Sequence, residues 1–339
     1  MRNKITIFHP LILPVAFLIF LTMGYIGSFN YRFTDPLNIN VIITVILACV
    51  VFTAGVLITR ADFKDKKIDF LSEKVLLILL AAGLLLQSLN LVLLGGIPLF
   101  SSTLKSSATT NLWRIAYPLV LITLNLLLAK FYHKKYILLI ILCGVIFTLN
   151  GYRTSVLGIL GSSFITLYLK NKISNKVSLI LIILITSLIL IVGYIASQSI
   201  ATQHWTLNPL ELVFYRAAFT LEVLEKIIPL NGTTHGHILS MIFSSGSPRT
   251  FIGNYVLHYN VCITSTLIGP ILLDFGYIGL IIQMFFMGVF LKLMYETKNI
   301  ALYSIILTHS LIWIETGSTD IMIWFLYLIG LIYIIQILR

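Results

Sequence analysis

Residues 147–158 read FTLNGYRTSVLG and place one cation, Arg153, inside a long and mostly apolar run. Lysines precede the run at 134–135 and follow it at 170–172, so both of its ends belong on the same side of a membrane. A single helix across the run would be about 50 Å long, whereas a hydrocarbon core is only about 30 Å thick. The stretch therefore predicts a hairpin of two short helices that turns at Asn150-Gly151 and carries Arg153 at its tip.

The composition of the chain is that of a membrane protein. Of its 339 residues, 58% are hydrophobic and 10% are charged, and the mean hydropathy is +1.01, whereas about a quarter of the residues of a soluble domain are charged. Apolar runs recur along the whole sequence, which predicts an all-α fold: a polytopic integral membrane helix bundle that forms a single transmembrane domain over residues 1–339. About ten transmembrane helices are expected, over residues 11–29, 38–59, 75–95, 114–132, 136–150, 154–169, 177–197, 268–291, 300–316 and 320–338.

The basic residues indicate how these helices are oriented. Lysines and arginines concentrate in alternate loops, so the positive-inside rule predicts a multi-pass protein of the cell membrane with both termini in the cytoplasm. On this assignment only two of the fifteen lysines lie on the outer face, but five of the eight arginines do. The outer arginines are Arg32, Arg114, Arg153, Arg216 and Arg249.

The preference for arginine on the outer face has a chemical interpretation. Topology alone does not require a guanidinium there, whereas the planar fork of a guanidinium matches the oxygens of a phosphate. The arginines therefore suggest a phosphate-bearing lipid headgroup as ligand. Simpler interpretations stay open for two of them, because Arg153 could snorkel to lipid headgroups and Arg216 could be an ordinary solvated helix charge.

Residues 198–267 form one long external loop, within which an interfacial helix is predicted at about 208–229. Asn208 is a suitable N-cap, a proline follows it, and Glu211 lies in the first turn. The apolar stripe of this helix would lie on the bilayer or cap the helix bundle. Arg216 lies on one flank of the stripe and glutamates lie on the other, which favours packing on the protein because membrane-surface helices prefer basic residues.

Polar candidates follow along the rest of the outer face. The histidines of residues 231–260 have no carboxylate or cysteine at a metal-binding spacing, so no metal is expected. His258 lies nearest the point where the chain re-enters the membrane and is a candidate general base. Asp274, near the outer end of the next helix, and Glu315, in the last hairpin, are candidate counter-ions for Arg153.

The sequence contains no Walker loop, dinucleotide-binding glycine motif, GxSxG elbow or HExxH motif. Nucleotide-activated sugars are cytosolic, so an enzyme at the outer face needs a substrate that arrives already activated. A lipid-linked pyrophosphate sugar meets that need, because arginines can hold the pyrophosphate and stabilise the charge that develops on it as a leaving group. A nearby histidine or carboxylate would deprotonate the acceptor hydroxyl, and no cofactor is expected.

Four segments of the chain resemble a known family. They are GYRTS at 151–155, FYRAAF at 214–219, SPRTF at 247–251 and TSTLIGPILLDFGYIGLI at 264–281. Their layout is similar to that of the polysaccharide or O-antigen polymerases of the Wzy type, the oligosaccharide repeat unit polymerases, and the resemblance extends over roughly residues 75–295.

The resemblance implies a GT-C-like architecture and a metal-independent glycosyltransferase. Members of this family join oligosaccharide repeat units outside the membrane, transferring the growing chain from a polyprenyl pyrophosphate to a new lipid-linked unit. Their functional residues are external arginines, which implies catalytic roles for Arg153, Arg216 and Arg249. The related O-antigen ligases use an external histidine, which implies a catalytic role for His258. The implied partners are polyprenyl-pyrophosphate-linked oligosaccharides, membrane lipids, and a chain-length regulator and flippase of the same pathway, with no nucleic acid.

Further candidates for substrate binding are Arg32, Arg114, Glu211 and Asp274. Rival functions stay open beside the polymerase. A ligase-like transferase would pass the glycan to a different acceptor. A transporter or flippase of lipid-linked oligosaccharide would show repeat symmetry and helices broken near the midplane, neither of which is evident in the sequence. A membrane scaffold or sensor would leave the external arginines individually dispensable.

Overall fold

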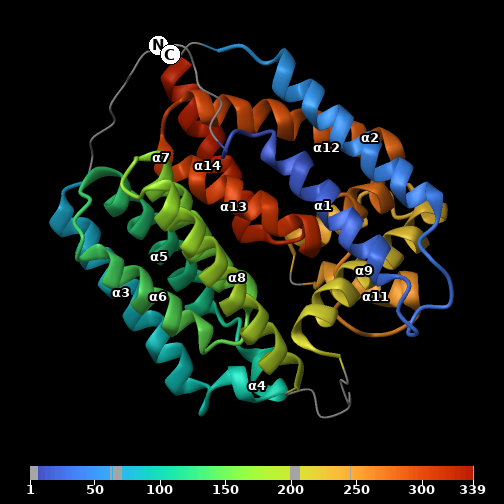
Figure 1. The fold of residues 1–339 in the computed structure, drawn as a ribbon, viewed down its shortest axis with the longest axis horizontal. Helices are drawn as coiled ribbons and strands as arrows, with labels where there is room; N and C mark the ends of the chain where they lie inside the picture. Colours follow the sequence, from blue (N-terminus) through green and yellow to red (C-terminus); the bar gives the residue numbers. More distant parts are fainter. Residues whose placement is uncertain (1–6, 62, 64–70, 199–206, 245, 339) are drawn as a thin grey trace. The chain divides into compact units, whose positions relative to one another are not determined.

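The computed structural model describes residues 7–61, 63, 71–198, 207–244 and 246–338, and these residues form helices and turns with no β-strand (Figure 1). The all-α class expected from the sequence is therefore confirmed. The chain divides into two compact units. The first unit comprises Met1–Lys64, Glu211–Thr297 and His309–Arg339, and the second comprises Asp65–Leu210 and Lys298–Thr308. The single transmembrane domain remains a prediction.

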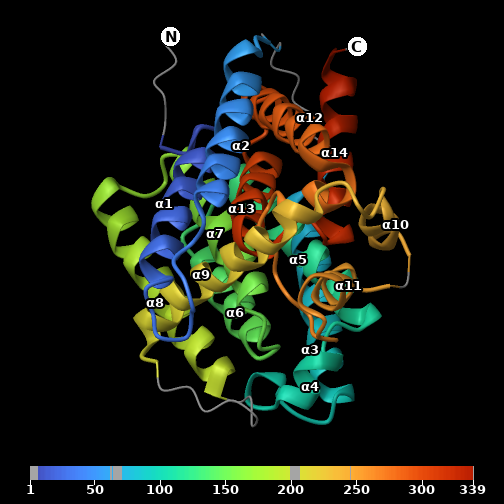
Figure 2. The same ribbon diagram turned by 90° about the vertical axis from the view of Figure 1, so that its right-hand side faces the viewer.

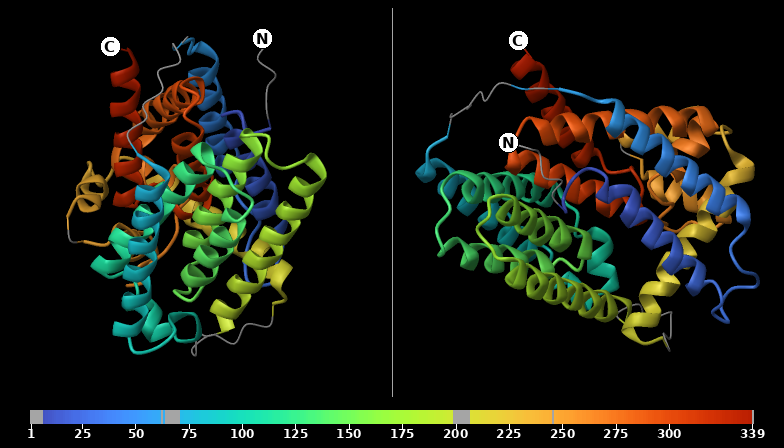
Figure 3. Two further views of the ribbon diagram at one scale, coloured as in Figure 1. Left: turned by 90° about the vertical axis from the view of Figure 1, so that its left-hand side faces the viewer. Right: turned by 45° about the horizontal axis from the view of Figure 1, so that its top comes forward.

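The second unit is a bundle of helices that follow one another along the chain (Figure 3, teal to yellow-green). Within it α3 packs closely against α5, and α7 packs against α5, α6 and α8. Its elements are α3 (Glu73–Leu93), η1 (Pro98–Phe100), α4 (Ser102–Ser107), α5 (Asn111–Lys130), α6 (Tyr136–Thr148), α7 (Arg153–Leu169) and α8 (Asn175–Gln198).

Buried polar side chains link α5 and α7 inside this bundle. Asn125 Nδ2 donates to Ser162 Oγ at 2.9 Å, and Thr166 Oγ1 donates to Asn125 Oδ1 at 2.7 Å. All three residues are buried. Because a polar group in hydrocarbon needs a partner, these bonds favour one particular pairing of α5 with α7.

The hairpin predicted from residues 147–158 is confirmed. Helix α6 ends at Thr148, α7 begins at Arg153, and the two helices pack against each other. Gly151 has a φ of +74°, and a Cβ at this position would lie 3.1 Å from Leu99 Cα. Glycine is therefore required twice in this turn, for its backbone conformation and for the close approach of η1.

The first unit combines long helices with several short ones. Its elements are α1 (Ile12–Gly27), α2 (Ile39–Ile58), α9 (Pro209–Ile227), η2 (Ile228–Leu230), α10 (His237–Ile242), α11 (Pro248–Leu257), α12 (Gly269–Glu296), α14 (Ile321–Leu338) and the second half of α13 (Ile300–Thr316). The first half of α13 belongs to the second unit.

Helices α2 and α12 pack closely along each other in the first unit, and glycines make this approach possible. A Cβ on Gly55 would lie 2.3 Å from Phe285 O, and a Cβ on Gly288 would lie 2.3 Å from Phe52 O. The backbone of each helix therefore contacts a glycine of the other helix. Such small-residue contacts are a common means of helix association in membranes, where packing replaces the hydrophobic effect.

Helix α12 is broken at Gly276, whose φ and ψ are 62° and −158°. The break frees backbone carbonyls, and the turn that follows η2 binds two of them: Gly232 N donates to Leu272 O at 2.9 Å and Thr234 N donates to Leu273 O at 3.2 Å. No broken helix is evident in the sequence, because the residues that make this break tolerable lie in a separate segment. The break lies about 24 Å before Lys292 and is nearer to the middle of the predicted span 268–291 than to its outer end.

The helices agree with a membrane protein. Five are long and apolar enough to cross a bilayer, judged by length and composition: α2, α3, α5, α12 and α14. Four shorter apolar helices are α1, α6, α7 and α13. These nine helices and α8 together occupy the ten ranges expected from the sequence. The number of membrane crossings remains a prediction.

The external loop contains more helix than its composition suggested. Helix α9 lies within the range expected for the interfacial helix, and residues 199–206 lie outside the described part of the chain. The polar residues 231–260 form α10 and α11, with α10 beside α12 (Figure 2). A local signal exists for α11, because Ser247 Oγ accepts from Thr250 N and Pro248 follows at the first helical position.

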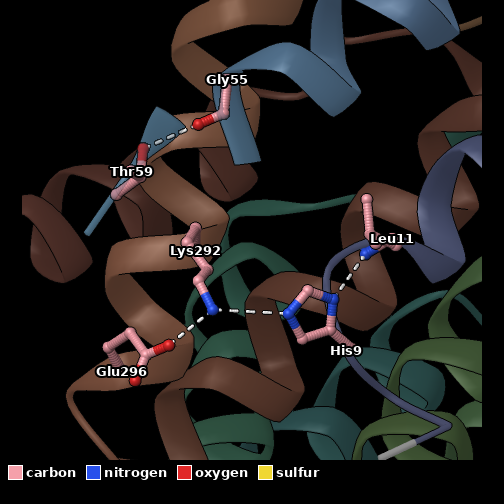
Figure 4. A network of polar contacts seen from close by, with 6 residues as sticks. All are labelled: His9, Leu11, Gly55, Thr59, Lys292 and Glu296. Carbon is pink, nitrogen blue, oxygen red and sulfur yellow. Dashed lines mark hydrogen bonds and ion pairs between the residues drawn. The ribbon is translucent and has the colours of Figure 1, made fainter. Parts of the chain in front are cut away.

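A polar network closes the end of α12 opposite to this loop (Figure 4). Lys292 Nζ lies 2.5 Å from Glu296 Oε1 and 3.4 Å from His9 Nε2. Partial burial, together with the positive charge of Lys292, lowers the pKa of His9. The imidazole is therefore neutral at pH 7, and it ties the segment before α1 to α12.

Candidate functional site

Two of the predicted arginines meet at the turn between α13 and α14, residues 315–320, which we call the α13–α14 turn. Arg216 Nη2, from α9, lies 3.6 Å from Glu315 Oε1. Arg249 Nε, from α11, donates to Thr319 Oγ1 at 3.1 Å. Both arginines belong to the first unit and are partly exposed. The structure thus brings guanidinium groups from two separate helices, α9 and α11, to one short turn.

Helix α9 holds Arg216 by burying its opposite face. Ala217, Leu221 and Leu224 are buried, and the backbone of α9 lies so close to α1 that a Cβ on Gly24 would be 3.1 Å from Ala217 O. Asn208 caps the start of the helix, because its Oδ1 accepts from Leu210 N at 3.0 Å. The packing of α9 on protein therefore fixes the side from which Arg216 reaches the turn.

Arg32 joins this group through an aromatic side chain. Its guanidinium carbon lies 5.6 Å from the centre of the Tyr215 ring, and Tyr215 directly precedes Arg216. Burial raises the pKa of the Tyr215 hydroxyl, while the charges of Arg32 and Arg216 oppose that shift. Tyr215 is therefore a neutral phenol, and its ring stabilises the Arg32 cation that lies over it.

Hydroxyl groups line the protein side of the α13–α14 turn. Ser318 Oγ donates to Leu267 O at 3.4 Å, and a Cβ on Gly317 would lie 3.1 Å from Thr266 O. Thr266 itself is buried in the left-handed conformation, with a φ of 61°. Its Oγ1 has no hydrogen-bond partner among the residues that the structure describes. A buried hydroxyl without a partner is costly and is frequently found where a site is built.

The same segment is connected to Arg249. Ile263 N donates to Arg249 O at 3.3 Å, and Thr264 Oγ1 lies 3.0 Å from Thr220 Oγ1 of α9. The hydroxyl-rich stretch 264–266 therefore runs between the two helices that carry the arginines. This stretch begins one of the segments that resemble the known family, but no role was predicted for its hydroxyl groups. Its signal was three consecutive hydroxyl residues at the edge of a membrane helix.

Asp274 is bound into the protein. It is buried, and its carboxylate accepts from Thr234 Oγ1 at 2.5 Å, from Ile238 N at 3.0 Å and from Leu239 N at 2.7 Å. These bonds attach the first turn of α10 to α12. The structure gives Asp274 this structural role, and a part in substrate binding remains a prediction.

His258 and Glu211 lie at helix ends. His258 follows the last residue of α11, is exposed and has a φ of 57°. It is nine residues from Arg249, which corresponds to about 14 Å along a helix. Glu211 is exposed in the first turn of α9. The roles of both residues remain predictions.

Arg153 and Arg114 lie in the second unit, so their relation to the arginines of the first unit remains a prediction. Arg153 is the first residue of α7, and its Nη1 would be 3.5 Å from a Cβ on Gly193 of α8. Arg114 is exposed in the first turn of α5. The neighbouring Tyr152 donates its hydroxyl proton to Lys105 O at 2.6 Å.

No group of three or more histidine, cysteine, aspartate or glutamate side chains is placed to hold a metal ion within residues 7–61, 63, 71–198, 207–244 and 246–338. Of the acidic candidates, Glu315 is paired with Arg216 and Asp274 is bonded to α10. The site is therefore one of guanidinium and hydroxyl groups, which suits an anionic and oxygen-rich ligand.

Two uncharacterized proteins of Methanocaldococcus jannaschii are similar to the chain. MJ0419 is 30% identical over 272 residues, which cover 75% of this chain and 74% of the relative. MJ0420 is 29% identical over 328 residues, which cover 95% and 77%. No solved structure shows a significant match. The sequence model of the putative O-antigen polymerase family matches residues 6–327, nearly the whole chain, and the chain therefore belongs to this family of membrane proteins.

Proposed function

We propose that the chain is a membrane glycosyltransferase that polymerises lipid-pyrophosphate-linked oligosaccharide repeat units at the outer face of the cell membrane. The observation that carries this proposal is the meeting of Arg216 and Arg249 at the α13–α14 turn. Family membership supports a polymerase, and the paired guanidinium groups support a pyrophosphate-bearing donor.

Donor binding follows from the contact between Arg216 and Glu315. The carboxylate already presents an oxygen to the guanidinium, 3.6 Å away and on the partly exposed side. The oxygens of a pyrophosphate carry more negative charge than the carboxylate and compete with it for the guanidinium group of Arg216. Once the pyrophosphate binds Arg216 and Arg249 together, Glu315 is released.

Transfer then requires one bond to form and one to break. The acceptor hydroxyl oxygen attacks the anomeric carbon of the donor sugar, and the bond from that carbon to the pyrophosphate oxygen breaks. The polyprenyl pyrophosphate leaves with the electron pair, and the arginines stabilise its charge. The hydroxyl proton passes to a carboxylate or imidazole, for which Glu315 and His258 are the candidates. No metal ion takes part in this scheme.

The remaining expectations complete the proposal. The protein crosses the membrane about ten times with a GT-C-like architecture and has both termini in the cytoplasm. Arg153, Arg114 and Arg32 supply further guanidinium groups for two lipid-linked substrates, and Glu211 binds sugar hydroxyls. A chain-length regulator and a flippase of the same pathway are its partners.

The test is a reconstitution with separated products. Purified protein in liposomes receives lipid-pyrophosphate-linked oligosaccharide, and glycans are resolved by length for the wild type and for the Arg153→Lys, Arg216→Lys and Arg249→Lys variants. Lysine keeps the charge but loses the bidentate fork, so we expect a ladder of products whose rate falls by about 100-fold in each variant. Lys226→Arg is the matched control on α9, because Lys226 pairs with Glu222 away from the turn.

Other outcomes select other functions. Transfer of a single glycan to a different acceptor would indicate a ligase. Movement of the lipid-linked sugar between leaflets without a ladder would indicate a flippase. A full ladder from all three lysine variants would refute the role of the guanidinium groups.

A further inference from the structure

The first unit contains an elongated apolar groove that the proposed transfer chemistry does not use. It has a volume of about 970 Å³ and is lined by residues of α10, α12, α13 and α14. On α12 the lining runs from Pro270 to Leu293, about 35 Å along the helix. Exposed apolar side chains such as Ile278, Ile282 and Phe286 form its edge. The groove is therefore open to the hydrocarbon of the membrane for the whole length of a span.

Most of the few polar groups in the wall bind the protein itself. Gln283 Nε2 donates to Leu267 O, Trp324 Nε1 donates to Ser318 O, and the Tyr327 hydroxyl is bonded to Ser310 Oγ. Asp274, at one end, is bound to α10. Trp313 also belongs to the lining, and its buried Nε1 has no hydrogen-bond partner among the residues that the structure describes. A wall with so few free polar groups suits a hydrocarbon ligand and does not suit a sugar.

One end of the groove reaches the arginines. Ser318 lines the groove, and the next residue, Thr319, accepts the hydrogen bond from Arg249. Glu315, the partner of Arg216, lies four residues before Thr319 in the chain. An occupant of the groove would thus place a headgroup beside two guanidinium groups. Charge complementarity calls for an anionic headgroup on a long apolar chain.

The dimensions select the kind of chain. A phospholipid tail is confined to one leaflet, about 15 Å of hydrocarbon, and would fill less than half of the groove. A single polyprenyl chain is both narrow enough and long enough.

We infer that the groove between α12 and α14 binds the polyprenyl chain of a lipid-linked substrate, with its pyrophosphate at Arg249 and Arg216. This inference rests on the proposed function for the identity of the lipid. It assigns a substrate role to residues of α12 and α14 that lie far from the arginines. It also makes α10 a wall of the lipid site, since Ile238, Leu239 and Phe243 line the groove.

The test uses the full-length protein in nanodiscs and a polyprenyl pyrophosphate with a diazirine at the far end of its chain. After irradiation, labelled peptides are identified by mass spectrometry. We expect labelling of α12 and α14. The Ile282→Trp variant fills the groove and should reduce labelling by at least about tenfold, the equivalent of ~1.4 kcal/mol of binding. Ile281→Trp is the matched control, because Ile281 is a neighbouring exposed residue of the same helix that does not line the groove.

Several results would overturn the inference. One is labelling confined to other helices, and another is equal labelling of the Ile281→Trp and Ile282→Trp variants. A third is competition by a phospholipid as strong as that by unlabelled polyprenyl pyrophosphate. The last is labelling found only between two copies of the chain. The lipid site in the groove and the polymerase activity can be refuted independently of each other. A normal product ladder from Ile282→Trp would refute the groove and leave the polymerase standing. Labelling of the groove without any ladder from the wild type would refute the polymerase and leave the lipid site standing.

Discussion

Glu315 is the residue on which the order of events depends. Its carboxylate holds Arg216 before donor binds and is a candidate to accept the acceptor proton afterwards. In Glu315→Gln the competing charge is lost, so we expect polyprenyl pyrophosphate to bind up to about fivefold more tightly, as for a partly exposed ion pair worth ~1 kcal/mol. Turnover should fall by about 100-fold if the carboxylate is the general base. Binding is measured by titration in nanodiscs and turnover by the product ladder.

The matched control is Glu296→Gln, which removes a carboxylate paired with Lys292 at the other end of α12. It should change neither quantity. Weaker binding of the lipid by Glu315→Gln would show that Glu315 supports the donor instead of competing with it. Unchanged turnover would assign the proton to another group, with His258 the next candidate.

At the scale of elements, α10 depends on a residue of another helix. Six residues are too few for a stable isolated helix, and the carboxylate of Asp274 supplies the bonds that its first turn needs. In Asp274→Asn one charged acceptor is lost, so we expect the unfolding free energy to fall by about 1–3 kcal/mol, measured by thermal unfolding in detergent. Asp35→Asn, at an exposed loop position of the same unit, should leave the unfolding temperature unchanged. Equal stability of both variants would contradict the role of Asp274.

This dependence also explains which elements could be predicted from the sequence. The signals of α9 are local: Asn208, a proline and an apolar stripe. The signals of the hairpin are local too, because length and flanking lysines required a turn at Gly151. Helix α10 and the break at Gly276 rely on partners some 40 residues away, which periodicity does not reveal. The arginines were identifiable from their residue type, whereas their meeting at Thr319 and Glu315 required the tertiary structure.

For the whole molecule, the orientation in the membrane can be read from a native cysteine. Cys262 is exposed, whereas Cys49 and Cys143 are buried. With the external loop outside, we expect a membrane-impermeant maleimide to modify intact cells at Cys262, and the label to be absent from Cys262→Ser. Labelling that requires permeabilised cells would reverse the orientation and place the arginines of the first unit in the cytoplasm. The readout is the mass of the purified protein.

The broken helix α12 has a consequence for biosynthesis. The turn at 231–234, which binds the carbonyls of Leu272 and Leu273, precedes α12 in the chain. Ribosomes therefore deliver the turn first, and on the predicted orientation it has already been translocated when α12 enters the membrane. The carbonyl groups that the kink at Gly276 leaves without a partner in the helix can therefore accept hydrogen bonds from this turn as soon as α12 is inserted. If the chain were divided between this turn and α12, and the fragment with α12 were made first, α12 would have to enter the membrane before the turn is present.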